Sequence, residues 1–363
     1  MGKPSSELVA PFVPPVAIPR AKAHRRTKRR TWIVAGAAIA AFGGLAAIVA
    51  GLIGKVSPAR RLAVATPVAE LGGHTNTVEC LAFVPGDNEI VSGDDDQRIL
   101  VWDLKASKLW FQLARGDDSG PCLAVAPNGM LVATAADTDV LKVWDWRSRK
   151  EVRRLAGHYV TFSPTGKLLA AALNANPLAL YDTTTWQEVG DLVGHTGSVW
   201  AMAFSADGKT LVSGDEYGFL RVWSVEDRLQ RHVLENGSRV HCLAIRRDRA
   251  VAAVVCDDGS LRQWDLLDGR LVGTWAAHQG RGLGVAFSPD DTKLATGGDD
   301  GTIALWDVRS GRELTRWLAH PTEAATVAFS SDGKRLASGG SDQTVKIWDV
   351  ESLLNKPASA GPR

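Results

Sequence analysis

Residues 320–349 read HPTEAATVAFSSDGKRLASGGSDQTVKIWD, in which a histidine stands 28 residues before a Trp-Asp pair. Short runs of alternating polar and apolar residues fill the interval, and Asp332-Gly333 separates the first run from the second. An Asp-Gly pair between two such runs predicts a β-hairpin. In the preceding copy of this pattern, residues 312–318 form another run after the Trp-Asp pair, so one unit contains four short strands. Four short strands per unit are typical of a propeller blade.

The unit occurs seven times, and each copy closes on an aromatic residue 37 to 42 residues after the previous one. The closing pairs are Trp102-Asp103, Trp144-Asp145, Tyr181-Asp182, Trp223-Ser224, Trp264-Asp265, Trp306-Asp307 and Trp348-Asp349. A period of this size indicates stacked copies of one supersecondary unit, none of which buries its apolar face alone. The chain is therefore predicted to be all-β, with a seven-bladed propeller over residues 63–350.

On its closing pairs, its Gly-His dipeptides and its Asp-Gly turns, the chain resembles the tryptophan-aspartate (WD) repeat family over residues 63–350. The resemblance implies that an N-terminal strand supplies the missing outer strand of the last blade and so closes the ring. It also implies a buried set of four side chains in each blade, which we call the tetrad. A tetrad joins a histidine, a second-strand Ser or Thr, a third-strand Trp and an Asp of the turn between those strands.

Three blades contain all four members of a tetrad. They are His74, Ser92, Asp96 and Trp102; His278, Thr296, Asp300 and Trp306; and His320, Ser338, Asp342 and Trp348. A buried imidazole, hydroxyl and indole N–H each need a hydrogen-bond partner where water is excluded. We therefore expect these histidines to be structural, not catalytic.

Blades 2, 3 and 5 depart from the pattern. Blade 3 runs from His158 to Phe162 in four residues where blade 4 takes nine, which predicts that five residues of its innermost strand are missing. Blade 3 also closes on Tyr181, so its rim is expected to be lower and looser. Blade 5 has Asn236 at the histidine position, and blade 2 has Gly116. Sequence drift explains these departures as well as a specialised surface does.

The chain before the propeller divides into a basic tail (1–30), an uncharged stretch (31–54) and a linker (55–62), and a disordered tail is expected over 351–363. The uncharged stretch has 24 residues. As a helix it would be roughly 36 Å long, enough to cross a hydrocarbon core of about 30 Å. The direct interpretation is one transmembrane helix. The alternative is a cleaved signal peptide, whose apolar core usually has about 7–15 residues.

Basic residues predict the orientation of this span. The tail holds eight Lys and Arg residues and one acid, giving +7, whereas residues 31–363 carry −5 of the total +2. Because Lys and Arg are retained on the cytoplasmic side, the tail is expected in the cytoplasm and the propeller outside it. The tail itself is expected to be disordered. Its basic run 20–30 either contacts anionic lipid headgroups or only sets the orientation. Nucleic-acid binding by the acidic propeller is not expected.

Sequence motifs for chemistry are missing. No CxxC, HExxH, G-x-S-x-G or phosphate-loop pattern occurs, so no enzyme, cofactor or metal site is expected. Cys80, Cys122 and Cys242 share one repeat position in three different blades, and with Cys256 they are not expected to form a disulfide framework.

A candidate docking surface comes from the residue seven before each closing aromatic. These residues are Asp95, Asp137, Asn174, Glu216, Asp257, Asp299 and Ser341, of which five are acidic. The resemblance places them on the face where partners usually dock, beside Glu79, Pro121, Trp200, His241, Leu283 and Ala325. An acidic rim around an apolar patch containing Trp200 would suit a basic peptide or protein. The alternative is that tight turns favour Asp in any case.

The function expected from the sequence is a membrane-anchored scaffold without enzymatic activity, which binds a protein or peptide through the propeller face. The alternative is a propeller enzyme or ligand sensor with a site in the central channel. His241 and Glu79 are the candidate groups for such a site.

Overall fold

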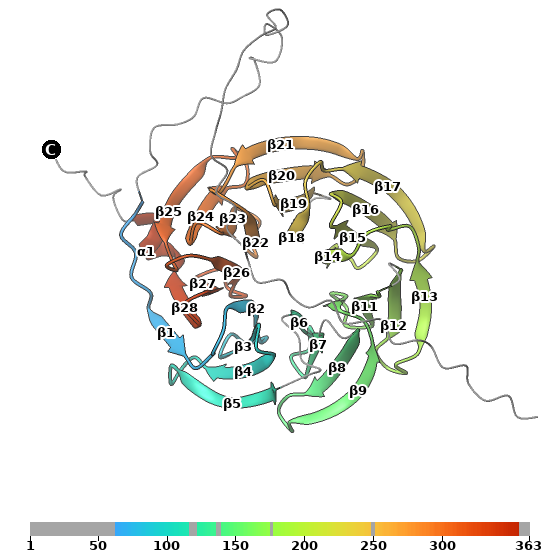
Figure 1. Cartoon of the computed structure of the whole chain (residues 1–363), viewed down its shortest axis with the longest axis horizontal. Coiled ribbons are helices and arrows are strands. Elements are labelled where there is room, and N and C mark those ends of the chain that lie inside the picture. The colour runs from blue at the N-terminus through green and yellow to red at the C-terminus, as the bar shows by residue number, and fades with distance from the viewer. Residues whose placement is uncertain (1–61, 116–121, 136–138, 175–176, 248–250, 356–363) are drawn as a thin grey trace, which may run out of the picture. The chain divides into compact units, whose positions relative to one another are not determined.

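The computed structural model describes residues 62–115, 122–135, 139–174, 177–247 and 251–355. Within these residues the chain forms seven antiparallel sheets of four strands, arranged as the blades of a closed ring (Figure 1). The sequence prediction of an all-β, seven-bladed propeller is confirmed. The predicted tail 1–30, the predicted span 31–54 and all but the last residue of the linker lie outside the described residues.

Each of the first four blades runs outward from its innermost strand. Blade 1 comprises β2 (Val78–Phe83), β3 (Glu89–Asp94), β4 (Arg98–Asp103) and β5 (Lys108–Arg115). Blade 2 comprises β6 (Cys122–Val125), β7 (Leu131–Ala135), β8 (Val140–Asp145) and β9 (Lys150–Ala156). Blade 3 comprises β10 (Tyr159–Phe162), β11 (Leu168–Ala172), β12 (Leu178–Asp182) and β13 (Glu188–Leu192). Blade 4 comprises β14 (Val199–Phe204), β15 (Thr210–Asp215), β16 (Phe219–Ser224) and β17 (Leu229–Glu235).

The last three blades follow the same order except at the closure. Blade 5 comprises β18 (Val240–Ile245), β19 (Val251–Cys256), β20 (Ser260–Asp265) and β21 (Arg270–Ala276). Blade 6 comprises β22 (Gly282–Phe287), β23 (Lys293–Gly298), β24 (Thr302–Asp307) and β25 (Glu313–Leu318). Blade 7 comprises β26 (Ala324–Phe329), β27 (Arg335–Gly340), β28 (Thr344–Asp349) and, as its outer strand, β1 (Ala69–Gly72).

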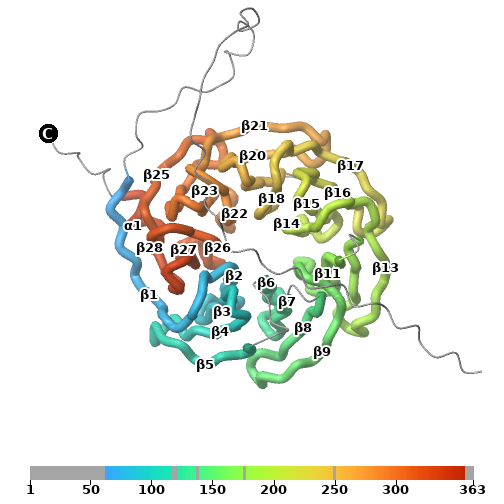
Figure 2. The backbone as a smooth tube through the Cα atoms, viewed as in Figure 1, coloured from blue at the N-terminus to red at the C-terminus, as the bar shows by residue number. Residues whose placement is uncertain are grey.

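The pairing of β1 with β28 closes the ring and confirms the predicted role of the N-terminal strand. Leu71 of β1 is buried, and β1 lies beside β28 in the tube view (Figure 2). A second junction joins blade 1 to blade 7, because Asp87 accepts a hydrogen bond of 2.9 Å from the backbone N–H of Ser331. Arg335 also donates to the Asp87 carbonyl at 2.7 Å. Closure removes the exposed sheet edges that an open propeller would present.

The C-terminal end differs from the prediction. A short helix, α1 (Val350–Asn355), follows β28 where a disordered tail was expected from residue 351. Val350 and Leu353 of this helix are buried, and burial of these two side chains holds the turn against the last blades. No helix in the described part of the chain is long and apolar enough to cross a membrane.

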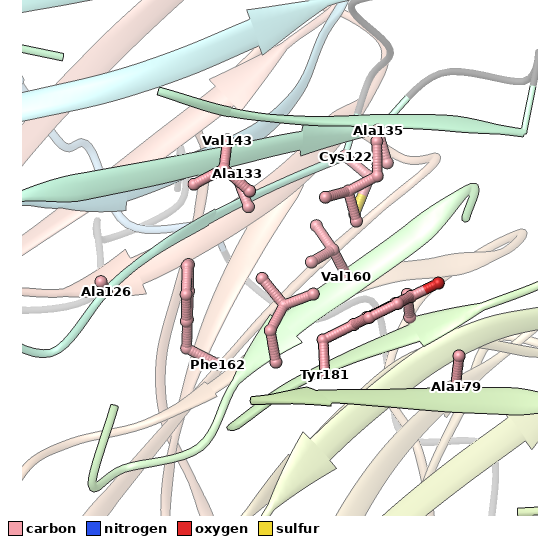
Figure 3. Close-up of a cluster of buried hydrophobic side chains, with 12 residues drawn as sticks. Cys122, Ala126, Ala133, Ala135, Val143, Val160, Phe162, Ala179 and Tyr181 are labelled. Carbon is pink, nitrogen blue, oxygen red and sulfur yellow. The ribbon is translucent and has the colours of Figure 1, made fainter. Parts of the chain in front are cut away.

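Blades pack on each other through apolar side chains from facing sheets. Figure 3 shows one such cluster between blades 2 and 3, where Val143 and Ala133 lie on one side and Phe162 and Tyr181 on the other. Tyr181 takes the place of the usual Trp, and its hydroxyl donates to the carbonyl of Ala156 at 3.4 Å. The smaller ring thus retains both its packing and a partner for its polar end.

The innermost strand of blade 3 is shortened less than the sequence predicted. β10 has four residues, whereas β14 has six. The other three missing residues come from the loop, because β10 begins directly after His158 whereas three residues separate His195 from β14. The strand keeps its buried positions Val160 and Phe162 because these fill the interface with blade 2.

Candidate interaction site

Tetrads form the framework under one face of the ring. In blade 7, Trp348 Nε1 donates to Ser338 Oγ at 2.9 Å, and Ser338 Oγ lies 2.8 Å from His320 Nε2. His320 Nδ1 lies 2.7 Å from Asp342. The indole N–H of Trp348 can only donate, so Ser338 Oγ accepts from it and can donate its own proton to Nε2 of His320. The imidazole then donates from Nδ1 to the carboxylate of Asp342. This chain of bonds satisfies all four side chains with a neutral histidine.

Blade 6 has the same arrangement. Trp306 Nε1 donates to Thr296 Oγ1 at 3.0 Å, and His278 lies 2.9 Å from that oxygen and 3.1 Å from Asp300. Burial lowers the pKa of His278, which favours the neutral ring. Burial is the largest effect on Asp300 and opposes its ionisation, but the hydrogen bonds from His278, Gln279 and Thr302 together outweigh burial and hold the pKa of this carboxyl well below its ordinary value.

Blade 1 corrects the sequence prediction. His74 Nδ1 bonds Asp94 at 2.8 Å, and Asp96 does not contact the histidine. Asp96 instead accepts hydrogen bonds from the side chains of Thr75, at 2.8 Å, and Asn76, at 3.1 Å. The bonds of His74 and Trp102 to Ser92, at 2.6 and 2.7 Å, are as expected. Asp94 is the last residue of β3 and its side chain is buried, so its carboxylate, and not that of Asp96, contacts the imidazole of His74.

Blade 4 contains a fourth tetrad that the sequence reasoning missed. His195 lies 2.6 Å from Ser213 and 2.8 Å from Asp215, and Trp223 donates to Ser213 at 2.8 Å. The signal was present, because the tripeptide Ser-Gly-Asp that ends β3 also ends β15. The missing Asp six residues before Trp223 concealed it.

Blade 5 satisfies the same positions with other residues. Trp264 Nε1 donates to Asn236 Oδ1 at 3.1 Å, and Asn236 Nδ2 donates to Cys256 Sγ at 3.1 Å. Val254 stands where blades 1, 2, 4, 6 and 7 have Ser or Thr. Asn236 supplies both an acceptor and donors, so it replaces histidine and serine together.

The face above these tetrads exposes an aromatic patch on blade 4. Trp200, in β14, is 44% exposed, and Tyr217, in the β15–β16 turn, is 62% exposed. The guanidinium of Arg239 lies 5.5 Å from the centre of the Trp200 ring and 3.8 Å from the Glu216 carboxylate. Tyr217 and Arg239 were not predicted. Two signals were available in the sequence. Tyr217 is an aromatic residue beside the rim acid Glu216, and Arg239 is a base directly before the innermost strand β18.

The acidic rim is partly paired on the face itself. His241 Nε2 lies 2.6 Å from Asp257. Arg281 donates to Asp299 at 2.7 and 2.8 Å and to Glu323 at 3.2 Å. Of the other predicted rim residues, Asp95 lies in the β3–β4 turn, and Asp137 and Pro121 lie outside the described residues.

The central channel opens among these residues. A cavity of about 640 Å³ is lined by residues from the innermost strands, including Glu79, Trp200, His241, Leu283 and Ala325. The structure therefore brings together five residues that the sequence placed around one opening. Within the described residues, no group of three or more His, Cys, Asp or Glu side chains could hold a metal ion.

Three thiols and a phenol also line this channel: Cys80, Cys122, Cys242 and Tyr159. Burial raises the pKa of Cys122 to about 12, and it raises the pKa values of Cys80 and Cys242 as well. A thiolate is the reactive form of cysteine, so these groups are poor nucleophiles at neutral pH. Among the described lining residues, these three thiols are therefore held in the protonated form.

A closed ring of seven four-stranded blades, held by such tetrads, defines a β-propeller interaction platform. The WD40 family model, described as "WD domain, G-beta repeat", matches residues 65–103, 186–224, 227–265, 269–307 and 311–349. The matches cover more than half of the chain, and the chain belongs to this family. Residues 104–185, which hold the divergent blade 2 and the three inner strands of blade 3, fall outside the matched ranges. WD-repeat propellers typically mediate protein–protein interaction.

Curated relatives share part of their length with this chain. Angio-associated migratory cell protein of Homo sapiens is 24% identical over 229 residues, which is 62% of this chain and 44% of that protein. Protein groucho of Drosophila melanogaster is 32% identical over 95 residues, 25% of this chain and 13% of that protein. The chain thus spans less than half the length of these relatives.

Proposed function

We propose that this protein is a membrane-anchored scaffold that binds a protein or peptide partner through the face bearing Trp200 and carries out no catalysis. The observation that carries the proposal is the exposure of Trp200 at the mouth of the channel, beside Tyr217 and under the guanidinium of Arg239. Large aromatic and arginine side chains dominate the binding energy of protein interfaces. Here they stand on a rigid platform of strands and tetrads.

The chemistry of the face favours a basic partner. Glu216, Asp257, Asp299 and Glu323 all lie in the loops of this face, and the chain from residue 31 onward carries −5. Arg239, Arg281 and His241 pair with these acids in the free protein. A basic segment would compete for the same carboxylates, which gives specificity and a salt-dependent association rate.

The anchor is part of the proposal and is supported by the uncharged stretch 31–54 between Arg30 and Lys55. Such a length of apolar and small residues suits a single membrane crossing. The eight basic residues before it favour a cytoplasmic N-terminus, with the propeller on the other side.

Partner capture by the full-length protein tests the interaction face. Trp200→Ala should lower the yield of a captured partner at least tenfold, and Asp299→Lys should lower it for a basic partner. Leu271→Ala is the matched control, because Leu271 is 43% exposed but lies on the outer strand β21. Capture that is unchanged by Trp200→Ala would refute this face as the docking site.

Protease protection tests the anchor and its orientation. After carbonate washing of membranes, a C-terminal tag that stays with the membrane and is cleaved on intact cells supports an uncleaved anchor and an external propeller. Release by carbonate contradicts the anchor, and a tag protected until lysis contradicts the orientation.

A second candidate function is a small-molecule site in the channel, and His158 favours it. His158 lines the cavity, and its side chain lies 3.8 Å from that of Asp139. Among the described residues, neither ring nitrogen of His158 nor Oδ1 of Asp139 has a hydrogen-bond partner. Buried polar atoms usually find partners, and a polar ligand would supply them. Native mass spectrometry of the purified protein decides this: a bound small molecule that His158→Phe abolishes supports the channel site, and the apo mass alone contradicts it.

A further inference from the structure

A cationic aromatic patch lies on blades 1 and 2, at the strand ends opposite those that carry the interaction face. It consists of Leu109 and Trp110 in β5, Met130 before β7, and Arg147 and Arg149 in the β8–β9 turn, and we call it the Trp110 patch. Leu109, Trp110 and Met130 are 41%, 48% and 63% exposed, and both arginines are exposed. The tetrads and the interaction face use none of these side chains.

Buried aromatic rings hold the exposed groups in place. Trp110 meets the buried ring of Trp146 edge to face at 6.0 Å and the ring of Phe111 at 5.5 Å. The Arg147 guanidinium lies 4.4 Å from the Trp146 ring, and that of Arg149 lies 4.0 Å from Phe111. Stacked guanidinium groups keep their charge at the surface while they lose little freedom on binding. The patch is therefore an ordered arrangement, not a set of isolated surface side chains.

The patch carries net positive charge. Three exposed lysines add to this charge. Lys105 lies in the β4–β5 turn, and Lys108 and Lys150 are the first residues of β5 and β9, directly after the β4–β5 and β8–β9 turns. The acids of these turns face their own backbone: Asp103 accepts from the N–H groups of Lys105 and Ala106, and Asp145 accepts from that of Ser148. Within the described residues, Arg147 and Arg149 have no carboxylate partner. An anionic surface would therefore meet uncompensated cations here.

Residues 62–68, which we call the strap, lead from the predicted anchor to β1; the strap starts beside β25 of blade 6, where the N–H of Ala63 donates to the carbonyl of Arg316 at 2.7 Å, and it ends at β1 beside blade 1. β1 contacts β5, and the two strands are neighbours on the ring in Figure 1. Val64 and Val68 of the strap are 72% and 62% exposed. Seven residues, 55–61, separate the predicted span from Leu62, and they reach at most about 25 Å. If the span crosses a bilayer, the outer edge of the propeller stays within reach of that bilayer.

We propose that the Trp110 patch binds the anionic headgroup region of the membrane that holds the anchor, with Trp110, Leu109 and Met130 entering the interface and Arg147 and Arg149 meeting phosphates. Tryptophan with aliphatic side chains and clustered Lys and Arg is the composition of an interfacial membrane contact. Because the β4–β5 and β8–β9 turns lie at the strand ends opposite the interaction face, contact through them leaves the interaction face open to a partner. The inference rests on the proposed anchor.

Hydrogen exchange of the full-length protein in lipid nanodiscs tests the contact. Amides of β5 and of the β8–β9 turn should exchange at least fivefold more slowly in discs with 30% phosphatidylglycerol than in pure phosphatidylcholine discs, because each cationic side chain near an anionic surface contributes about fivefold in affinity. Arg147→Glu with Arg149→Glu should abolish the difference. Lys209→Glu with Arg270→Glu, which makes the same charge change on blades 4 and 5, should preserve it.

Equal exchange in the two lipids, or protection that survives in the Arg147→Glu, Arg149→Glu protein, overturns the proposal and leaves an acidic protein as the occupant. Failure of the anchor gives a different result, because the chain then does not enter the discs. In that case the full chain is sedimented with vesicles of the same two compositions. If only the Arg147→Glu, Arg149→Glu change weakens binding to anionic vesicles, the patch is supported and the anchor is refuted. If wild type and both double variants bind equally, the patch is refuted. Partner capture through Trp200 is not affected by either outcome.

Discussion

The carboxylate that meets a tetrad histidine comes from one of two positions, and the residue at the first position decides which. In blades 1 and 4 an Asp stands eight residues before the Trp, whereas in blades 6 and 7 a Gly stands there and the Asp follows two residues later. A Cβ added at Gly298 or Gly340 would overlap the ring of its histidine. Histidine therefore lies against the glycine backbone in two blades, and it is displaced onto the first carboxylate in the other two.

Two neighbouring aspartates in blade 1 provide a direct test of this rule. Asp94→Ala should lower the free energy of unfolding by about 1–3 kcal/mol, because it leaves the buried N–H of His74 without an acceptor. Asp96→Ala should change it by less than about 0.5 kcal/mol, because Asp96 contacts only exposed side chains. Chemical denaturation of both variants measures the difference. A larger loss in Asp96→Ala than in Asp94→Ala would contradict the assignment.

Stability should fall as the pH is lowered from 7, in two stages. Burial lowers the pKa values of His195 and His278 in the folded state below the ordinary value of 6.5, so the unfolded chain binds more protons between these values. Stability is therefore highest above pH 6.5 and is lost as the pH falls below it. A second loss begins below about pH 4, because the pKa values of Asp215 and Asp300 are lowered from 3.8.

The melting temperature measured in steps from pH 7.5 to 3.5 checks this expectation. His195→Asn, which copies the residue that blade 5 uses, should melt lower than wild type at pH 7 but lose less between pH 7 and pH 5.5. A melting temperature that is constant or rises over that interval would show that the buried histidines are not the groups concerned.

At the scale of the strand, β1 is the element on which closure depends. It supplies the outer strand of blade 7, and Leu71 is buried between blades 7 and 1. Deletion of residues 63–71 exposes the edge of β28 and leaves a cavity where Leu71 packs. The deletion variant should therefore lack the cooperative melting transition that the wild-type protein shows at its melting temperature. Substitution of Leu71 by Ala alone should cost about 2–5 kcal/mol. Calorimetry of the full chain and of both variants measures this, and cooperative melting of the deletion variant at the wild-type temperature would refute closure by β1.

Strand order and blade number followed from the sequence because the repeat spacing and the Asp-Gly turns act locally and recur in register, and closure by the N-terminal strand followed from the family resemblance. The choice between Asp94 and Asp96 did not, because it depends on how a histidine 20 residues away approaches the β3–β4 turn. Likewise, the pairing of Arg281 with Asp299 and Glu323 joins two blades. A count of acidic residues along the chain predicts that the rim is negatively charged, but it does not predict which basic side chains pair with the rim.

At the scale of the whole ring, the blades divide into two groups. Blades 1, 4, 6 and 7 hold complete tetrads and blade 5 holds its Asn236 equivalent, whereas blade 2 and the three inner strands of blade 3 lie outside the WD40 matches. Trp200, Arg239 and Arg281 all stand on blades 4 to 6. The proposed docking face is thus carried by the regular part of the ring, and the Trp110 patch involves the irregular part. Partner binding and membrane contact would then act on different blades.

An external propeller with four free cysteines requires that its thiols resist oxidation, and burial supplies this property for Cys122 and Cys256. With a pKa of about 12 against an ordinary 9.0, the thiolate fraction of Cys122 is about a thousandfold lower than that of an exposed cysteine. Ellman's reagent at pH 7.5 should therefore modify Cys122 in the native protein at least about a hundredfold more slowly than a free thiol, and should count four thiols in guanidinium. Cys122→Ser serves as the control that identifies this site by mass spectrometry. Rapid modification of native Cys122 would mean that the channel admits solvent and an activating base. That result would favour a chemically active channel over a scaffold without enzymatic activity.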